Sequence, residues 1–169
     1  GGEIGSSLCR SEELGVVKSF LIKAKKSNTK IILPIDCVVT TSIEKRSDIK
    51  IFNINHIPKN YMGVDIGPKT IELFTSIIIS SKTIMWNGPM GVSEIDDFSV
   101  GTKKLSNSII KSTNKGGFSL IGGGDTISDV SRFGLKSKFS YVSTGGGAML
   151  EFFKNRNLPG VLNLKKLNT

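Results

Sequence analysis

Two periodicities of apolar and polar residues alternate along this 169-residue chain. From Ser11 to Lys26, apolar residues recur every three or four positions, which predicts an amphipathic scaffold helix capped by Ser11. The stretches 30–34 and 37–40 are rich in β-branched and apolar residues, typical of a buried strand followed by an extended segment. The polar stretch 42–61 predicts a loop excursion with a short strand at 49–54.

The second half of the chain repeats a strand-then-helix pattern. Gly67-Pro68 predicts the start of a helix, because proline is favoured at the first helical position. Further on, the pattern predicts strands at 83–86, 117–121 and 141–142, with helices after each of them and a stop at Pro159. This alternation predicts an α/β fold, and we expect a Rossmann-like three-layer α/β/α domain with a mainly parallel sheet.

Three apolar runs in this half each end in a turn that contains glycine. They are Ile84 to Glu94, Leu120 to Thr126 and Phe139 to Gly147, and the last two contain three consecutive glycines. In an open parallel sheet the carboxyl ends of neighbouring strands share one edge, where ligands bind. We therefore expect the three turns to lie side by side.

The residue types in the central turn favour an anionic ligand that carries a metal ion. Consecutive glycines let backbone N–H groups approach a ligand closely, and a helix starting at Asp125 adds the positive end of its dipole. Asp125 would repel a bare phosphate, whereas it suits a magnesium ion that bridges a carboxylate and phosphates. The turn therefore predicts a metal-nucleotide site, and the alternative is a glycine-rich connection needed only for tight packing.

Composition and missing motifs narrow the classes of function. The net charge of +9 favours anionic partners, but the lysines are scattered and no nucleic-acid motif accompanies them, so we expect no nucleic-acid partner. Apolar runs are too short to span a membrane, and Cys9, Cys37 and His56 lack metal-ligand spacing. GxxxxGK[ST], GxGxxG, GxSxG and HExxH are all missing, which leaves phosphoryl transfer as a reaction that needs none of them.

Four motifs in order give the pattern a family likeness. They are Trp86 to Val92, Gly122 to Thr126, Ser143 to Ala148 and Leu158 to Val161, and together they resemble the C-terminal, nucleotide-binding domain of phosphoglycerate kinase. The resemblance runs through nearly the whole chain, so residues 1–169 are identified as that domain, incomplete at its N-terminal end. The family's N-terminal domain and a Gly-Gly-Ala-Lys segment are missing, so we interpret the chain as a fragment.

The resemblance implies a role for each matching residue. Gly63, Val64, Pro89 and Val92 would line an adenine pocket, with ordinary core packing as the alternative at Val64 and Val92. Glu94 would accept hydrogen bonds from the ribose, and Asp125 would bind Mg²⁺. The other nucleotide-binding positions would be Asn87, Gly91, Gly122, Gly123, Gly124 and Thr126, and the catalytic positions Thr144, Gly145, Gly146 and Gly147. Departures from the family at Tyr61, Met90 and Ser93 concern the adenine pocket.

The implied function is that of a phosphoglycerate kinase, which moves a phosphoryl group between 1,3-bisphosphoglycerate and ADP in glycolysis. Mg²⁺ and ADP or ATP are the implied ligands, and 3-phosphoglycerate would bind through the missing N-terminal domain. We expect a cytoplasmic monomer, with a plastid as the alternative compartment, and no turnover by this chain alone. A stand-alone nucleotide-binding or regulatory module without catalysis is the alternative function.

Overall fold

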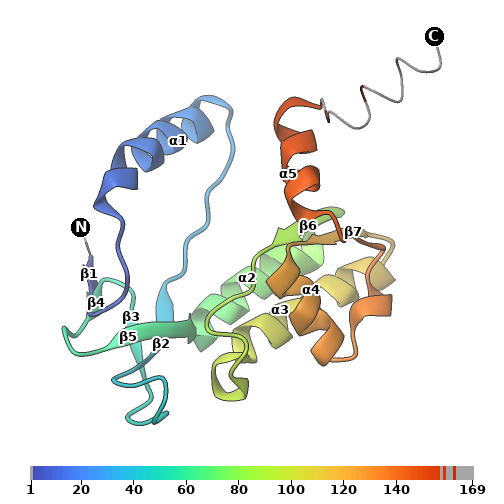
Figure 1. Ribbon diagram of the computed structural model, residues 1–169. Helices are drawn as coiled ribbons and strands as arrows, with labels where there is room; N and C mark the ends of the chain where they lie inside the picture. Colours follow the sequence, from blue (N-terminus) through green and yellow to red (C-terminus); the bar gives the residue numbers. More distant parts are fainter. Residues whose placement is uncertain (1, 157, 159–161, 163–169) are drawn as a thin grey trace. The chain divides into compact units, whose positions relative to one another are not determined.

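The computed structural model describes residues 2–156, 158 and 162, which fall into two compact units (Figure 1). The first unit ends at Thr70 and the second begins at Ile71. The expected stop at Pro159 and the motif residues 159–161 lie outside the described residues.

The first unit contains a small antiparallel sheet. Its elements are β1 (Glu3–Ile4), a 3-10 helix (Ser11–Glu13), α1 (Leu14–Lys26), β2 (Asp36–Thr40), β3 (Lys50–Asn53), β4 (His56–Ile57) and β5 (Met62–Ile66). Strand β2 lies between β3 and β5 and is antiparallel to both, while β1 and β4 form a separate parallel pair. The strand expected within 49–54 is confirmed as β3. The pairing in this unit differs from the mainly parallel sheet that we expected, because residues 41–49 contain no crossover helix and return the chain antiparallel beside β2.

Two expectations for the start of the chain are wrong. Residues 29–34 form no strand, and Leu33 is 65% exposed, because an apolar run becomes a strand only beside a hydrogen-bonding neighbour. Ser11 lies inside the 3-10 helix, and neither that helix nor α1 has a side-chain capping hydrogen bond at its N-terminus. The helix itself is present, but Ala24 is its one buried residue among those described, so its apolar stripe is not covered.

Asp36 connects β2 to the start of α2 (Pro68–Ser80). Its carboxylate accepts the backbone N–H groups of Lys69 and Thr70, at 3.0 and 2.8 Å, and the Thr70 hydroxyl at 2.6 Å. Free N–H groups at the first turn of a helix need such acceptors. Pro68 occupies the first helical position, as the Gly67-Pro68 pair predicted.

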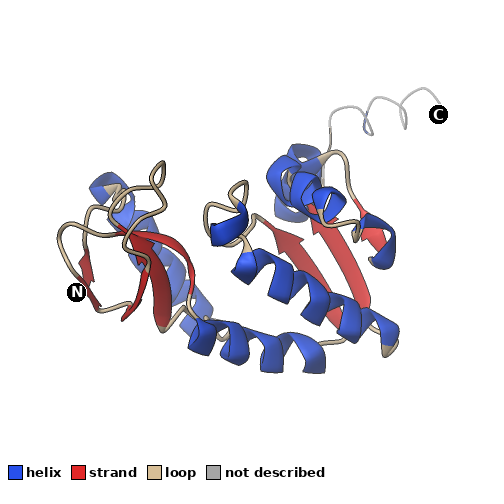
Figure 2. Ribbon diagram, turned by 90° about the horizontal axis from the view of Figure 1, so that it is seen from below, coloured by secondary structure: helices blue, strands red, loops and turns tan. Residues whose placement is uncertain are grey.

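The second unit contains the parallel sheet. Its elements are the rest of α2, β6 (Thr83–Asn87), a 3-10 helix (Asp96–Phe98), α3 (Val100–Asn114), β7 (Phe118–Gly122), α4 (Gly124–Arg132), a 3-10 helix (Lys136–Lys138), β8 (Tyr141–Val142) and α5 (Gly146–Asn155). The strand order is β6-β7-β8, and both pairs are parallel. Figure 2 shows strands of this sheet side by side with helices packed across them. The unit has an α/β Rossmann-like fold, as expected from the alternation of strand and helix.

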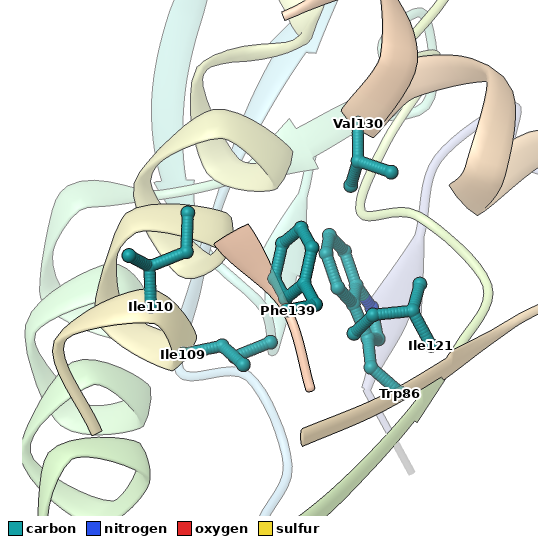
Figure 3. Packing of buried hydrophobic residues seen from close by; sticks show 6 residues of the cluster. All are labelled: Trp86, Ile109, Ile110, Ile121, Val130 and Phe139. Atoms are coloured by element: carbon teal, nitrogen blue, oxygen red, sulfur yellow. The ribbon is translucent and has the colours of Figure 1, made fainter. Parts of the chain in front are cut away.

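One apolar cluster joins this sheet to its helices. It contains Trp86, Ile109, Ile110, Ile121, Val130 and Phe139, and Ile121 and Val130 are fully buried (Figure 3). These side chains come from β6, α3, β7, α4 and the segment before β8, so the cluster fixes α3 and α4 against the strands. Burying a side chain of this size stabilises a fold by roughly 1.5–3 kcal/mol. Across the part of the chain that is described, no helix is long and apolar enough to span a membrane.

Candidate functional site

The three glycine-bearing turns follow neighbouring strands. Asn87 ends β6 opposite Gly122, which ends β7, and Val142 ends β8 opposite Ile121. Because the strands are parallel, the turns after them meet at the carboxyl edge of the sheet. This arrangement confirms the expectation that the three turns lie side by side.

The turn after β6 is held in place by hydrogen bonds from three sides. The Trp86 indole donates to the carbonyl of Gly88 at 2.7 Å, and the Gly88 N–H donates to the Thr126 hydroxyl at 2.8 Å. The Thr102 hydroxyl of α3 accepts the Met90 N–H at 2.8 Å and lies 2.7 Å from the Met90 carbonyl. Thr126 and Thr102 are fully buried. Thr126 therefore joins the first turn of α4 to the neighbouring glycine turn.

The two triple-glycine segments touch each other through their backbones. A Cβ on Gly146 would stand 2.9 Å from the Gly123 nitrogen and 3.1 Å from its Cα. Gly123 has φ +90° and lies against Asn87, whose Oδ1 would be 3.2 Å from a Cβ there. A side chain at Gly122 would meet Met149 of α5. A Cβ would crowd these neighbours, so Gly122, Gly123 and Gly146 have a packing role whatever the turns bind.

Two helices begin in these turns. Helix α4 starts at Gly124 with Asp125 in its first turn, and α5 starts at Gly146 after Gly145. Neither N-terminus has a side-chain cap, and Gly124, Asp125 and Gly147 in the two first turns are exposed, so backbone N–H groups there can reach a ligand. Because α4 starts where β7 ends and α5 follows β8, both positive helix ends lie at the same edge of the sheet. Such an arrangement can bind phosphate groups.

A cavity of about 410 Å³ lies between the turn after β6 and α4. Its lining contains four of the predicted nucleotide-binding residues, one position that the resemblance connected with the adenine pocket, and two residues that the sequence did not suggest. The predicted ones are Pro89, Gly91, Glu94 and Asp125, the adenine-pocket departure is Ser93, and the additional ones are Ser128 and Asp129. The volume is within the range of small-molecule sites. The structure thus brings the predicted ribose acceptor and the predicted metal ligand to one cavity.

Other predicted positions lie outside this cavity. Gly63 and Val64 belong to the first unit, where the Gly63 N–H donates to the Ser7 hydroxyl at 3.0 Å and Val64 is 1% exposed. Burial at Val64 agrees with the alternative of core packing. Thr144 is exposed at the end of β8, and Val92 is half-buried in the turn after β6. His56 is exposed in the first unit.

The oxygen ligands near Asp125 fit a magnesium ion that is shared with phosphates. Asp125 is exposed at the start of α4, and Glu94 and Asp129 line the same cavity. Within the described residues, no three acidic, histidine or cysteine side chains converge closely enough to hold a metal by themselves. Mg²⁺ usually takes one or two carboxylates and completes its shell with substrate phosphates and water. The residues present therefore fit the ion in combination with a nucleotide.

The sequence contained a helical spacing that could have indicated Asp129 and Arg132, which we did not predict. Asp129 follows Asp125 by four positions, which places both carboxylates on the same face of a helix. Arg132 follows Asp129 by three positions, and its Nη2 lies 3.1 Å from Asp129 Oδ1. The contacts of Ser93 and Thr102 involve partners distant in sequence and left no such signal.

The fold and the site define a protein of the Rossmann-like α/β class whose glycine turns and helix N-termini meet at the carboxyl edge of a parallel sheet. A family model described as phosphoglycerate kinase matches residues 1–156. The chain therefore belongs to the phosphoglycerate kinase family, as the resemblance of its motifs implied.

Relatives and solved structures give the same family. The phosphoglycerate kinases of Thermosipho africanus and Porphyromonas gingivalis are 48% and 43% identical over 97% and 95% of the chain, which spans 41% and 38% of them. The structure of phosphoglycerate kinase from Coxiella burnetii matches all of this chain with a TM-score of 0.92 and 37% identity, over 43% of its own length. The Pyrococcus horikoshii enzyme matches 96% of the chain with a TM-score of 0.69 and 28% identity, over 40% of its length. The chain thus spans about two fifths of these relatives.

Proposed function

We propose that this chain binds Mg²⁺-ADP and Mg²⁺-ATP as the C-terminal part of a phosphoglycerate kinase. The complete enzyme would transfer a phosphoryl group between 1,3-bisphosphoglycerate and ADP, giving 3-phosphoglycerate and ATP. The observation that carries the proposal is the pair of helix N-termini at one sheet edge, with Asp125 in the first turn of α4. Membership of the family supports the identity of the reaction.

The chain's own residues would act mainly by binding and orienting the nucleotide. The N–H groups of 122–124 and 145–147 would donate to phosphate oxygens, and those near Gly146 would face the phosphoryl group during transfer. Asp125 would hold Mg²⁺, which supplies positive charge to the phosphates when bound. Glu94, exposed and on the same cavity, would accept hydrogen bonds from ribose hydroxyls.

Within the second unit, Pro89 and Val92 would form apolar surroundings of the adenine ring. In the described turn, Pro89 and Val92 are half-buried and so present apolar surface to a ligand. Gly63 and Val64 lie in the first unit and stay predicted adenine-pocket positions, and the Val64 side chain is buried there. The acidic substrate would bind through a domain beyond this chain, and we expect a cytoplasmic monomer.

The test is a calorimetric titration of the chain with ADP in the presence and absence of Mg²⁺. Asp125→Ala is expected to weaken binding with Mg²⁺ by about tenfold or more and to leave metal-free binding nearly unchanged, because the carboxylate acts through the ion. Glu72→Ala, at an exposed acidic position on α2, is the matched control and should change neither value. Equal losses with and without Mg²⁺ would contradict the role of Asp125, and no ADP binding by the unsubstituted chain would contradict the function.

A stand-alone binding module would give the same titration, so a second measurement separates the two functions. Joining the chain to the remaining three fifths of a relative such as the Thermosipho africanus enzyme should produce ATP from ADP and 1,3-bisphosphoglycerate. A fusion that folds and binds ADP but forms no ATP would favour the non-catalytic module.

A further inference from the structure

Arg132, in the last turn of α4, connects that helix to the turn after β6. Its Nη2 donates a hydrogen bond to the backbone carbonyl of Ser93, and its Nη1 forms an ion pair with Asp96. Ser93 and Asp96 lie on either side of Glu94 in the chain. The guanidinium therefore contacts the backbone and a side chain of the segment that carries Glu94.

The same guanidinium is fixed on α4 by a buried carboxylate. Nη2 lies 3.1 Å from Asp129 Oδ1, and the Asp129 side chain is 7% exposed. Among the described residues, Asp129 Oδ2 has no hydrogen-bond partner, and the ion pair with Arg132 is the one found for this carboxylate. A buried carboxylate is costly without a cation, so Asp129 holds Arg132 strongly. The Phe133 ring also packs 4.8 Å from the Arg132 guanidinium.

The two ends of this connection differ in strength. The Asp96 side chain is 87% exposed, and exposed ion pairs are worth little, so that contact alone would not fix the turn. Ser93 is 3% exposed, and its carbonyl accepts a charge-assisted hydrogen bond from Arg132, which is the stronger contact. The position of the turn relative to α4 therefore depends on Arg132 between Asp129 and the Ser93 carbonyl.

Glu94 and Asp125 line one cavity but come from these two different segments. We propose that Arg132, held by Asp129, is a positioning residue that sets where Glu94 stands relative to Asp125 and so determines recognition of the ribose of a bound nucleotide. The proposal rests on the proposed nucleotide-binding function. Arg132 itself touches no atom of the reaction in this scheme and acts through the turn that carries Glu94.

The test compares ADP with 2′,3′-dideoxy-ADP, which lacks the hydroxyls assigned to Glu94. Arg132→Gln is expected to weaken ADP binding about tenfold and to change dideoxy-ADP binding less than twofold. Without Arg132, Glu94 would no longer be held in place for its charge-assisted hydrogen bond to the ribose hydroxyls, and dideoxy-ADP does not make that bond. In a Glu94→Ala background the same substitution should change ADP binding less than twofold. The effects of two substitutions are not additive when one residue acts through the other. Arg132→Lys keeps the charge but not the forked donor, so its affinity for ADP should lie between that of the unsubstituted chain and that of Arg132→Gln.

Arg132→Gln leaves the Asp129 carboxylate buried without its cation and so risks unfolding. The double variant Arg132→Gln/Asp129→Asn removes that buried charge with an isosteric amide at position 129, and it should show the same selective loss for ADP. Lys111→Gln, at an exposed position on α3, is the control for loss of one positive charge and should bind both nucleotides normally.

Each possible outcome supports or refutes the positioning role of Arg132. Selective loss of ADP affinity that disappears in the Glu94→Ala background supports the positioning role. Equal weakening of ADP and dideoxy-ADP, or unchanged ADP binding by the folded double variant, refutes it while leaving the nucleotide-binding function standing. Failure of the unsubstituted chain to bind ADP refutes the function and the positioning role together.

Discussion

Gly146→Ala should push the two triple-glycine turns apart. The added Cβ would stand 2.9 Å from the nitrogen of Gly123 and 3.1 Å from its Cα, whereas carbon atoms pack at about 3.5–4.0 Å. Both contacts are with backbone atoms, so the clash cannot be relieved by rotating a side chain. The backbone of one turn must therefore move by several tenths of an ångström.

The expected cost follows from two opposing effects. Inserting a methyl group into a close-packed site costs about 1–3 kcal/mol, and replacing glycine by alanine in a helix recovers up to about 1 kcal/mol. We expect Gly146→Ala to lower the free energy of unfolding by about 1–2 kcal/mol. Displacing one N–H that binds a phosphate oxygen would remove about 1.5–3 kcal/mol of affinity, so ADP binding should weaken at least tenfold.

The neighbouring glycine supplies the control. A Cβ on Gly147 meets no atom of the described residues within 4 Å, so Gly147→Ala should leave the free energy of unfolding unchanged or raise it slightly. Both variants would be compared by urea unfolding followed by circular dichroism, and Gly146→Ala also by calorimetric titration with ADP. Equal stability of the two variants would refute the reasoning, because the argument depends on the contact that Gly146 makes and Gly147 does not.

Three further outcomes are expected. Burial raises the pKa of Asp36, but hydrogen bonds from Thr70 and Lys69 and the Lys69 charge outweigh it and leave that pKa below its ordinary value of about 3.9. Asp36→Asn should therefore cost about 2 kcal/mol in urea unfolding at pH 7, and this difference should persist above about pH 4 and vanish as the pH falls through the lowered pKa. Thr126→Val removes the acceptor of the Gly88 N–H, so exchange of that amide with D₂O should accelerate at least tenfold; unchanged protection would contradict the contact. In a coupled assay for ATP formation, the chain alone should be at least about 10² slower than the same chain joined to the remaining part of a relative, since the described turns contain no lysine or arginine side chain to stabilise the transition state.

Local sequence predicted the second unit well because the patterns that specify its strands, helices and turns lie within a few neighbouring residues. Alternating apolar runs and glycine turns predicted β6, β7 and β8, and the Gly67-Pro68 pair predicted the start of α2 at Pro68. The three turns could be expected at one edge because parallel pairing follows from strand and helix alternation. The motifs within those turns also indicated the family, which the family model matches over residues 1–156.

Contacts between distant residues decided the rest. The stretch 30–34 has the composition of a strand, yet none forms, because a strand requires a neighbour that local sequence does not specify. Antiparallel pairing of β2 with β3 and β5 likewise depends on which edges meet.

For the candidate site too, local sequence predicted some features and tertiary contacts determined the others. The sequence by itself determined which residues could bind phosphate and metal: glycines without a Cβ, and Asp125 at the start of a helix. Only the tertiary structure decided that Gly146 touches Gly123, that Glu94 shares a cavity with Asp125, and that Arg132 bridges the segments between them. Chemical character belongs to each residue, whereas distances between residues far apart in the chain are set by packing of the whole unit.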